Sequence, residues 1–168
     1  MGQKTYGLVR GNANIGSYFP VAADQYFHHG YGGFVELNSS GHITIADSAS
    51  EVLLGWAMFP ESGTGAAAST VDYWLSSATA GADKLFVITD LNAWFSMPIW
   101  TGGAIDEMTQ AQVGGAVNIS YTNGSTAGQF ADLNDTGSDD IILIRDWNSE
   151  DTSIVIVQMN PKEIQVST

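Results

Sequence analysis

The chain of 168 residues contains no cysteine and only five lysines and arginines. Without cysteine it has neither a disulfide framework nor a thiolate that could act as a nucleophile or metal ligand. Its 18 acidic residues give a net charge of −13. Because nucleic acids and anionic membrane surfaces are bound by clustered basic side chains, neither is expected as a partner.

Long apolar runs are also missing. The longest spans about residues 52–59 and is interrupted by Gly55, whereas a membrane helix needs ~20 apolar residues. The first residues lack the apolar segment of a signal peptide. We therefore expect a protein made in a cytoplasm, with no membrane partner. Only 14% of the residues are charged and 19 are glycine, which favours a sheet protein with many turns.

Short strands separated by turn residues dominate the chain from residue 31 onward. Residues 34–37 and 43–45 flank a turn at 38–41, which predicts a β-hairpin. Residues 141–144 and 154–157 flank a polar turn and predict a second hairpin. Further strands are expected at residues 52–57, 84–88, 93–97 and 116–119. The sequence thus predicts an all-β fold.

Signals for helices are few. Ser69 and Asp72 have the spacing of a capping box, and apolar residues follow with a helical period, which predicts a helix over residues 69–78. The aromatic Trp74 would also suit a strand. Residues 109–113 favour a single helical turn. We expect at most one or two short helices on a small β-barrel or β-tulip-like body.

A short pattern occurs twice in the predicted body, which extends over residues 31–168. Residues 32–37 and 114–119 share Gly-Gly-x-Val-x-Leu/Ile, and each copy precedes a turn that contains glycine. Such an echo is typical of two related lobes or of two halves of one barrel. Two interpretations stay open: a single barrel, or two related lobes at about residues 31–100 and 101–168.

Residues 1–30 have a different character. Gly2, Gly7, Gly11, Gly16 and Pro20 interrupt them, and aromatic residues lie between these breaks. The segment is too apolar for a solvated tail and too interrupted for a helix. We expect an extended N-terminal arm that lies on the body or on a neighbouring molecule.

Motifs for metal binding and catalysis are incomplete. His28 and His29 are adjacent, so on an extended chain they point in opposite directions. The acidic loop 132–140 begins like a calcium loop, but Leu143 stands where such a loop has its bidentate glutamate, which leaves a cation site or a plain acidic turn. Neither a nucleophile elbow nor a phosphate or dinucleotide loop occurs. We expect no enzyme, no cofactor and no metal.

Tryptophan is frequent, with five residues. Trp56 and Trp94 lie in strand patterns and are expected in the core. Trp100 and Trp147 lie near loops, where tryptophan anchors protein interfaces or stacks on sugars. The interface is favoured because the arm is aromatic as well. The residues predicted to bind a partner are Tyr6, Arg10, Tyr18, Phe19, Tyr26, Phe27, Trp100 and Trp147.

The strand pattern resembles that of a known family. Residues 33–46 combine Gly-Phe-Val-Glu-Leu with a later Gly-His-Ile and Ala46, and residues 53–57 are Leu-Leu-Gly-Trp-Ala. These segments, together with 90–98 and 113–119, resemble small β-barrel head decoration (capsid cement) proteins of tailed bacteriophages.

The resemblance implies a structural virion protein on the capsid exterior, made in the host cytoplasm. It would form a homotrimer, bind neighbouring major capsid protein subunits and stabilise the shell, without a cofactor. Residues 1–30 would then grip a capsid subunit or a neighbouring protomer. The alternative is a carbohydrate-binding β module on a virion or cell surface.

Overall fold

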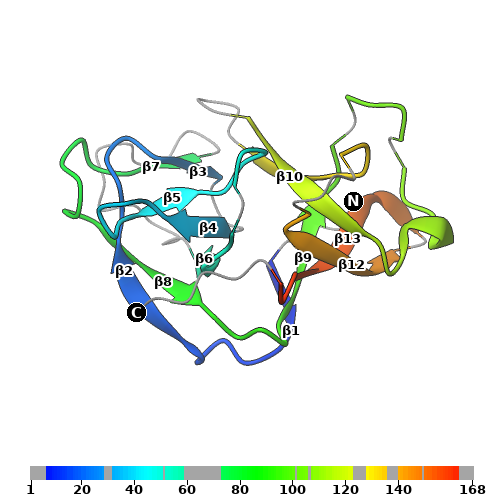
Figure 1. The fold of residues 1–168 in the computed structure, drawn as a ribbon, viewed down its shortest axis with the longest axis horizontal. Helices are drawn as coiled ribbons and strands as arrows, with labels where there is room; N and C mark the ends of the chain where they lie inside the picture. Colours follow the sequence, from blue (N-terminus) through cyan, green and yellow to red (C-terminus); the bar gives the residue numbers. More distant parts are fainter. Residues whose placement is uncertain are drawn as a thin grey trace.

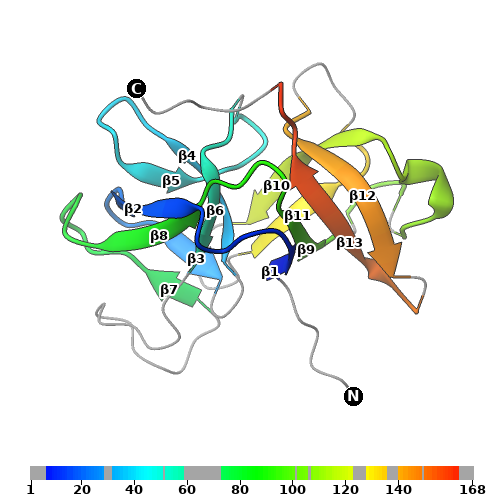
Figure 2. The same cartoon turned by 90° about the horizontal axis from the view of Figure 1, so that it is seen from below.

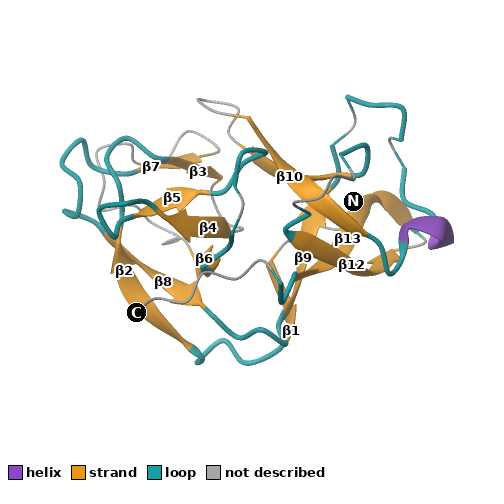
Figure 3. Ribbon diagram, in the orientation of Figure 1, coloured by secondary structure: helices purple, strands orange, loops and turns teal. Residues whose placement is uncertain are grey.

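The computed structural model describes residues 7–28, 32–50, 52–58, 73–100, 102–105, 107–122, 128–135, 140–148 and 150–162. These residues form strands β1 to β13 and one short 3-10 helix, so the predicted all-β fold is confirmed (Figure 3). The strands build two lobes that lie side by side (Figure 1).

The first lobe contains a five-stranded antiparallel sheet with the order β2-β8-β6-β4-β5. A two-stranded ribbon of β3 and β7 accompanies it. The strands are β2 (Gly16–Pro20), β3 (Tyr26–His28), β4 (Gly33–Leu37), β5 (Ile43–Ile45), β6 (Gly55–Met58), β7 (Tyr73–Leu75) and β8 (Lys84–Ile88).

The second lobe is a six-stranded antiparallel sheet with the order β1-β9-β13-β12-β10-β11. A 3-10 helix, η1 (Gln110–Gln112), precedes β10 and begins with a capping box at Thr109. The strands are β1 (Gly7–Arg10), β9 (Trp94–Pro98), β10 (Ala116–Thr122), β11 (Gly128–Asp132), β12 (Ile142–Asn148) and β13 (Asp151–Met159).

Both predicted hairpins are confirmed, as β4–β5 and β12–β13, and so is the helical turn at η1. The predicted helix at 69–78 is wrong where the structure describes it, because residues 73–75 are β7. Trp74 is buried beside Phe27, with ring centroids 5.5 Å apart. Pairing with β3 and burial of this aromatic outweigh the helical spacing. Residues 69–72, with the expected capping box, lie outside the described residues.

Residues 7–28 of the expected arm are part of the two lobes, not an arm that lies on them. Residues 7–28 form three strands, each paired within the chain: β1 with β9, β2 with β8 and β3 with β7. Val21 and Phe27 are almost fully buried, which explains why a segment so rich in apolar side chains is incorporated into the lobes.

The chain passes between the lobes twice, from β1 to β2 and from β8 to β9. The Asp90 carboxylate joins the two passages, because it accepts hydrogen bonds from the backbone N–H of Asn12 (2.8 Å) and of Asn92 (3.0 Å). The division therefore lies between residues 88 and 94, not near residue 100 as expected. Residues 94–98 belong to the second lobe because β9 pairs with β13.

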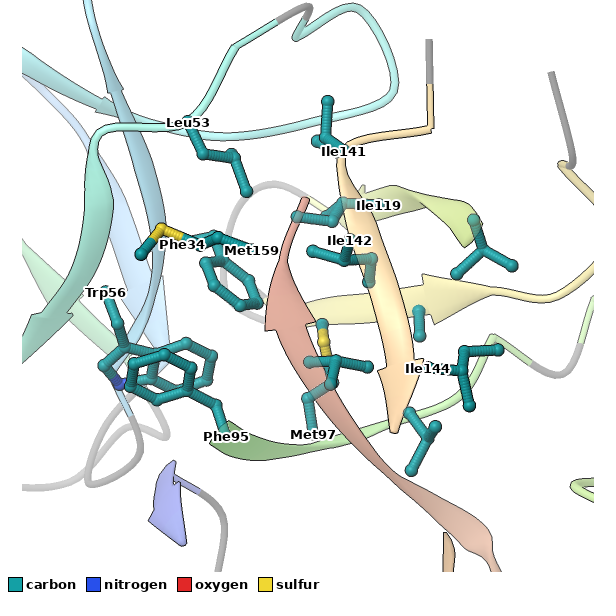
Figure 4. Packing of buried hydrophobic residues seen from close by; sticks show 14 of the residues in the cluster. Phe34, Leu53, Trp56, Phe95, Met97, Ile119, Ile141, Ile142, Ile144 and Met159 are labelled. Atoms are coloured by element: carbon teal, nitrogen blue, oxygen red, sulfur yellow. The ribbon is translucent and has the colours of Figure 1, made fainter. Parts of the chain in front are cut away.

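Two clusters of buried side chains form the core. One fills the interior of the first lobe and includes Phe27, Val35 and Trp74. The other joins both lobes: Trp56 of β6 stacks on Phe95 of β9, with ring centroids 4.7 Å apart and an interplanar angle of 7° (Figure 4). Each fully buried large side chain stabilises the fold by ~1.5–3 kcal/mol, so this shared core holds the lobes together.

A buried amide also connects the lobes. Gln129 of β11 donates from Nε2 to the carbonyl oxygens of Phe34 (2.9 Å) and Ala46 (2.8 Å). Its Oε1 accepts the Phe34 N–H over 2.7 Å. The Gln129 amide thus forms hydrogen bonds with both the N–H and the carbonyl of Phe34 in β4, as the backbone of a neighbouring strand would.

The two lobes repeat one arrangement of five strands. The orders β2-β8-β6-β4-β5 and β9-β13-β12-β10-β11 are the same when the strands are numbered along the chain within each lobe, with the ribbon and β1 set aside. In both sheets, the strand that comes first in the chain lies at one end and is followed across the sheet by the fifth, fourth, second and third strands. The strands β4 and β10, which carry the two Gly-Gly-x-Val patterns, hold the same place.

The closure of each sheet repeats as well. Val21 and Ile99 each follow the proline that ends the first strand, and each forms one parallel bridge to the third strand, at Ile43 and Ala131. The residue after each bridge donates its N–H to the bridged residue's carbonyl oxygen: Ala22 to Ile43 over 3.0 Å, and Trp100 to Ala131 over 2.9 Å. Each sheet thus curls toward a barrel without closing fully.

The pairings give a consistent register for the whole unit. They match Pro20 with Pro98, Val35 with Val117, Glu36 with Asn118, Gly55 with Ile142 and Val87 with Val157. The lobes are two versions of one five-stranded unit. They differ in their additions: the first has the ribbon β3–β7, and the second has β1 beside β9.

Candidate binding surface

Large apolar side chains are exposed mainly along the N-terminal strands and the passages between the lobes. We call this set the apolar strip. It consists of Leu8 (37% exposed), Val9 (53%), Ile15 (47%), Tyr18 (70%), Met58 (48%) and Leu91 (43%). Figure 2 shows β1, β2, β8 and their connections together on one side of the molecule. Exposed apolar residues that form a contiguous surface mark interaction sites more often than scattered ones do.

Part of the strip is a row across the first sheet. Tyr18, Phe86 and Met58 lie directly opposite one another on β2, β8 and β6, so their side chains project from the same face. The rings of Tyr18 and Phe86 meet edge to face at 5.3 Å. Farther along the same face, Trp56 packs in the core shared with the second lobe. The row is the uncovered continuation of an internal packing surface.

The sequence segments that form most of the strip contain few Asp and Glu residues. The first acid of the chain is Asp24, and residues 84–105 contain only Asp90, whose carboxylate binds two backbone N–H groups. The charged side chains among the strands of the strip are Arg10 and Lys84. The Arg10 guanidinium lies 4.8 Å from the ring centre of Trp94, within the range of a cation–π contact. In a chain of net charge −13, these strands and passages are poor in acids, although Asp83 directly precedes Lys84.

The predicted partner-binding residues divide into exposed and covered ones. Tyr18 and Arg10 are exposed, whereas Phe19 and Tyr26 are half-buried in the first lobe. Phe27 is fully buried in the core of the first lobe, so its assignment to partner contact is corrected. Tyr6 lies outside the described residues.

Trp100 and Trp147 are both half-buried on the second lobe. Trp100 packs edge to face on Phe130, with centroids 5.6 Å apart, and Trp147 packs against the shared core. Neither lies on the apolar strip. Trp56 is buried as expected, and Trp94 is half-buried beneath Arg10.

Sequence reasoning missed the aliphatic members of the strip. Val9, Ile15, Met58 and Leu91 resemble core residues in the sequence, and their exposure depends on which sheet face the other lobe covers. The signal that was available is the absence of acids from residues 1–23, which marks the same region.

Metal ligands do not gather in the part of the chain that the structure describes: no group of three or more His, Asp or Glu side chains there could hold an ion. In the acidic loop, Asp132 accepts the Asn134 N–H over 3.0 Å, an ordinary turn contact. Residues 136–139 of that loop, and His29, lie outside the described residues.

Two titrating groups are shifted by burial. Desolvation raises the pKa of Glu36, because the charged carboxylate is disfavoured at its half-buried position in β4. Desolvation also raises the pKa of Tyr121 to about 12. The Tyr121 hydroxyl donates to the Tyr26 carbonyl over 2.7 Å, so it links β10 to the ribbon. Both shifts have structural causes and neither group lies on the apolar strip.

Comparison with other proteins gives no family. No protein-family model, curated protein or solved structure matches the chain. Within the described ranges, no helix is long and apolar enough to cross a membrane.

Proposed function

We propose that the chain is a structural virion protein that binds the outside of a phage capsid and cements neighbouring major capsid protein subunits. The observation that carries the proposal is the apolar strip: large exposed side chains on strands and passages that are poor in acids, on a body that is otherwise strongly acidic. The acid beside Leu91 is Asp90, whose carboxylate binds two backbone N–H groups. Such a surface gains free energy by leaving water against another protein. We therefore propose that the apolar strip contacts the capsid, and no longer assign this contact to all the aromatic residues of the N-terminal segment.

The construction of the body supports the same proposal. Two lobes that share a core through Trp56 and Phe95 form a stiff body able to touch two neighbouring subunits. Repetition of a modest contact over a capsid lattice multiplies its strength through avidity. The resemblance of residues 33–46, 53–57, 90–98 and 113–119 to capsid cement proteins is consistent with this role.

The decisive experiment measures binding to shells. Capsids of the phage that encodes the chain are assembled without it, mixed with the purified protein and sedimented. We expect saturable co-sedimentation, and capsids that resist heat or chelator better with the protein than without it. Ile15→Asp should weaken binding by more than tenfold, because it places an acid within the apolar strip. Wild-type protein that stays in the supernatant would contradict the proposal.

The carbohydrate-binding alternative finds no specific support. All five tryptophans are among the described residues, and each is buried or half-buried, whereas a sugar platform presents an open ring face. Reproducible hits on a glycan array, abolished by Trp100→Ala or Trp147→Ala in a folded protein, would revive that alternative. The homotrimer implied by the resemblance stays a prediction, which sedimentation of the free protein tests.

A further inference from the structure

The two lobes differ at one sheet edge: β9 has a neighbouring strand there, and its counterpart β2 has none among the described residues. In the second lobe, β1 pairs with the outer edge of β9, so Gly7, Leu8 and Arg10 lie opposite Ser96, Phe95 and Trp94. The strand of the first lobe that corresponds to β9 is β2. It pairs with β8 on one side, and no strand among the described residues occupies its other side. The position that β1 fills in one lobe is thus not filled by any described strand in the other.

The backbone groups on this open edge follow from the observed hydrogen bonds. On the side of β8, Ile15 accepts from Thr89 and Val21 donates to Asp83, each over 2.9 Å. Because antiparallel strands alternate, Ser17 also bonds toward β8, and the N–H and C=O groups of Gly16 and Tyr18 point outward. Pro20, the last residue of β2, has no N–H and limits the usable edge to residues 16–18.

This edge lacks the protection that the comparable edge of the second lobe has. The register of β1 shifts between Leu8 and Arg10, which marks a bulge, and Arg10 adds a charge. Bulges, charges and prolines keep edge strands from pairing with other chains, and of these β2 has only Pro20, at its end. The pairing of β2 with β8 is regular, and residues 16–20 contain no charge. Its side chain Tyr18 is 70% exposed.

We infer that the open edge of β2 pairs with β2 of a second copy of this chain, as an antiparallel dimer with a two-fold axis at Ser17. Gly16 of each copy then lies opposite Tyr18 of the other, and each such pair exchanges two backbone hydrogen bonds. At Gly16 a Cβ atom would already overlap the carbonyl oxygen of Val87 and the ring of Phe86, so the Tyr18 ring of the other copy would lie against Phe86. The apolar row of Met58, Phe86 and Tyr18 becomes continuous across the dimer.

Charge selects the second copy as the occupant. Two bodies of net charge −13 repel each other, and the cost is lowest where acids are absent. Residues 1–23 contain no acid, so β2 meets its own counterpart with little like-charge repulsion. A two-fold interface needs one self-complementary surface, which an antiparallel strand pair supplies. The inference does not depend on capsid binding, and it departs from the trimer that the family resemblance implies.

The absence of cysteine from the chain gives a direct test. In the dimer the two Ser17 residues form a non-hydrogen-bonded pair with Cα atoms ~4.5 Å apart, which suits a disulfide. Ser17→Cys should form a covalent dimer rapidly in air, seen on a non-reducing gel. Leu91→Cys, an exposed position of the strip away from the edge, should stay monomeric on that gel. Equal and slow cross-linking of both variants would overturn the inference.

Sedimentation equilibrium of the full-length chain supplies the second test. We expect a dimer at submillimolar concentration. Tyr18→Lys, which sets two positive charges beside each other across the axis, should weaken dimerisation more than tenfold, whereas Leu91→Lys should not change it. Circular dichroism and melting curves check that both variants fold. A wild-type monomer, a trimer, or a dimer unaffected by Tyr18→Lys would each refute the pairing, while capsid binding would be judged separately by co-sedimentation with shells.

Discussion

The first and second lobes share a strand order and a register, yet they are packed differently. At the position where β12 has Ile142, β6 has Gly55. A Cβ atom on Gly55 would overlap the carbonyl oxygen of Ile88 and lie 2.7 Å from Cγ1 of Val87. At Gly55, β6 thus leaves no space beside β8 for a side chain. The topology tolerates different side chains as long as each lobe fills its own interior.

The lobes also differ in what covers them. The second lobe has β1 over the edge of β9, and its buried residues belong to the core that both lobes share. The first lobe has the ribbon β3–β7 and a core of its own, but no described strand lies beside the outer edge of β2. The repeated unit is therefore completed by different segments in its two copies, and this asymmetry is where we place contact with other molecules.

Of the substitutions that test this difference between the lobes, replacing Gly55 should destabilise the protein most. Gly55→Ala should lower the free energy of unfolding by more than ~3 kcal/mol, because the rigid backbone of β8 cannot yield to the new methyl group. Denaturant unfolding followed by tryptophan fluorescence measures the change. Gly115→Ala is the matched control on the second lobe, where the nearest atom to the added Cβ lies at 3.1 Å. A loss below ~1 kcal/mol for Gly55→Ala would show that the close approach is not needed.

Removing Gln129 should uncouple the lobes. Gln129→Ala leaves the Phe34 N–H and the Ala46 carbonyl without the amide that binds them, while the Phe34 carbonyl keeps the Ala46 N–H, at a total cost of ~2–5 kcal/mol. Hydrogen exchange should speed up first at the Phe34 amide. Gln110→Ala, on the exposed η1, controls for loss of an amide side chain. Wild-type exchange at Phe34 in the Gln129 variant would contradict the coupling.

A smaller effect is expected at the paired passages between the lobes. Asp90→Ala removes the acceptor of the Asn12 and Asn92 N–H groups and should cost ~1–2 kcal/mol. The backbone amide hydrogen of Asn12 should then exchange faster, because in the described structure Asp90 is the acceptor of its hydrogen bond. Asp90→Asn, which keeps one acceptor oxygen, should recover part of the stability. If both variants melt like the wild type, Asp90 does not hold the passages together.

The smallest expected effect concerns Glu36, whose counterpart in the second lobe is the neutral Asn118. The pKa of Glu36 is raised above its unfolded value, so folding favours the protonated form. The stability it contributes is present below the unfolded pKa and is lost as the pH rises through the folded pKa. Glu36→Gln should therefore melt slightly higher than the wild type at about pH 7, with the gap closing below about pH 4. A gap that widens in acid would reverse this assignment.

Local patterns predicted much of the fold. The hairpins β4–β5 and β12–β13 follow from short alternating runs around turn residues, which depend on neighbours in sequence. The helix expected at 69–78 failed because Trp74 pairs with β3, nearly fifty residues earlier in the chain. The division of the lobes failed for a related reason: β9 looks continuous with β8 along the sequence but pairs with β13.

The sequence by itself determined that this protein is all-β, acidic and free of cysteine chemistry, because composition and period-two alternation act residue by residue. It also placed the acid-free region at the N-terminal end. Only the tertiary structure decided that Phe27 is buried while Tyr18 is exposed, and that β2 keeps an open edge while β9 does not. Those outcomes depend on which distant strand arrives beside each residue, and alternation along one strand carries no information about its neighbour.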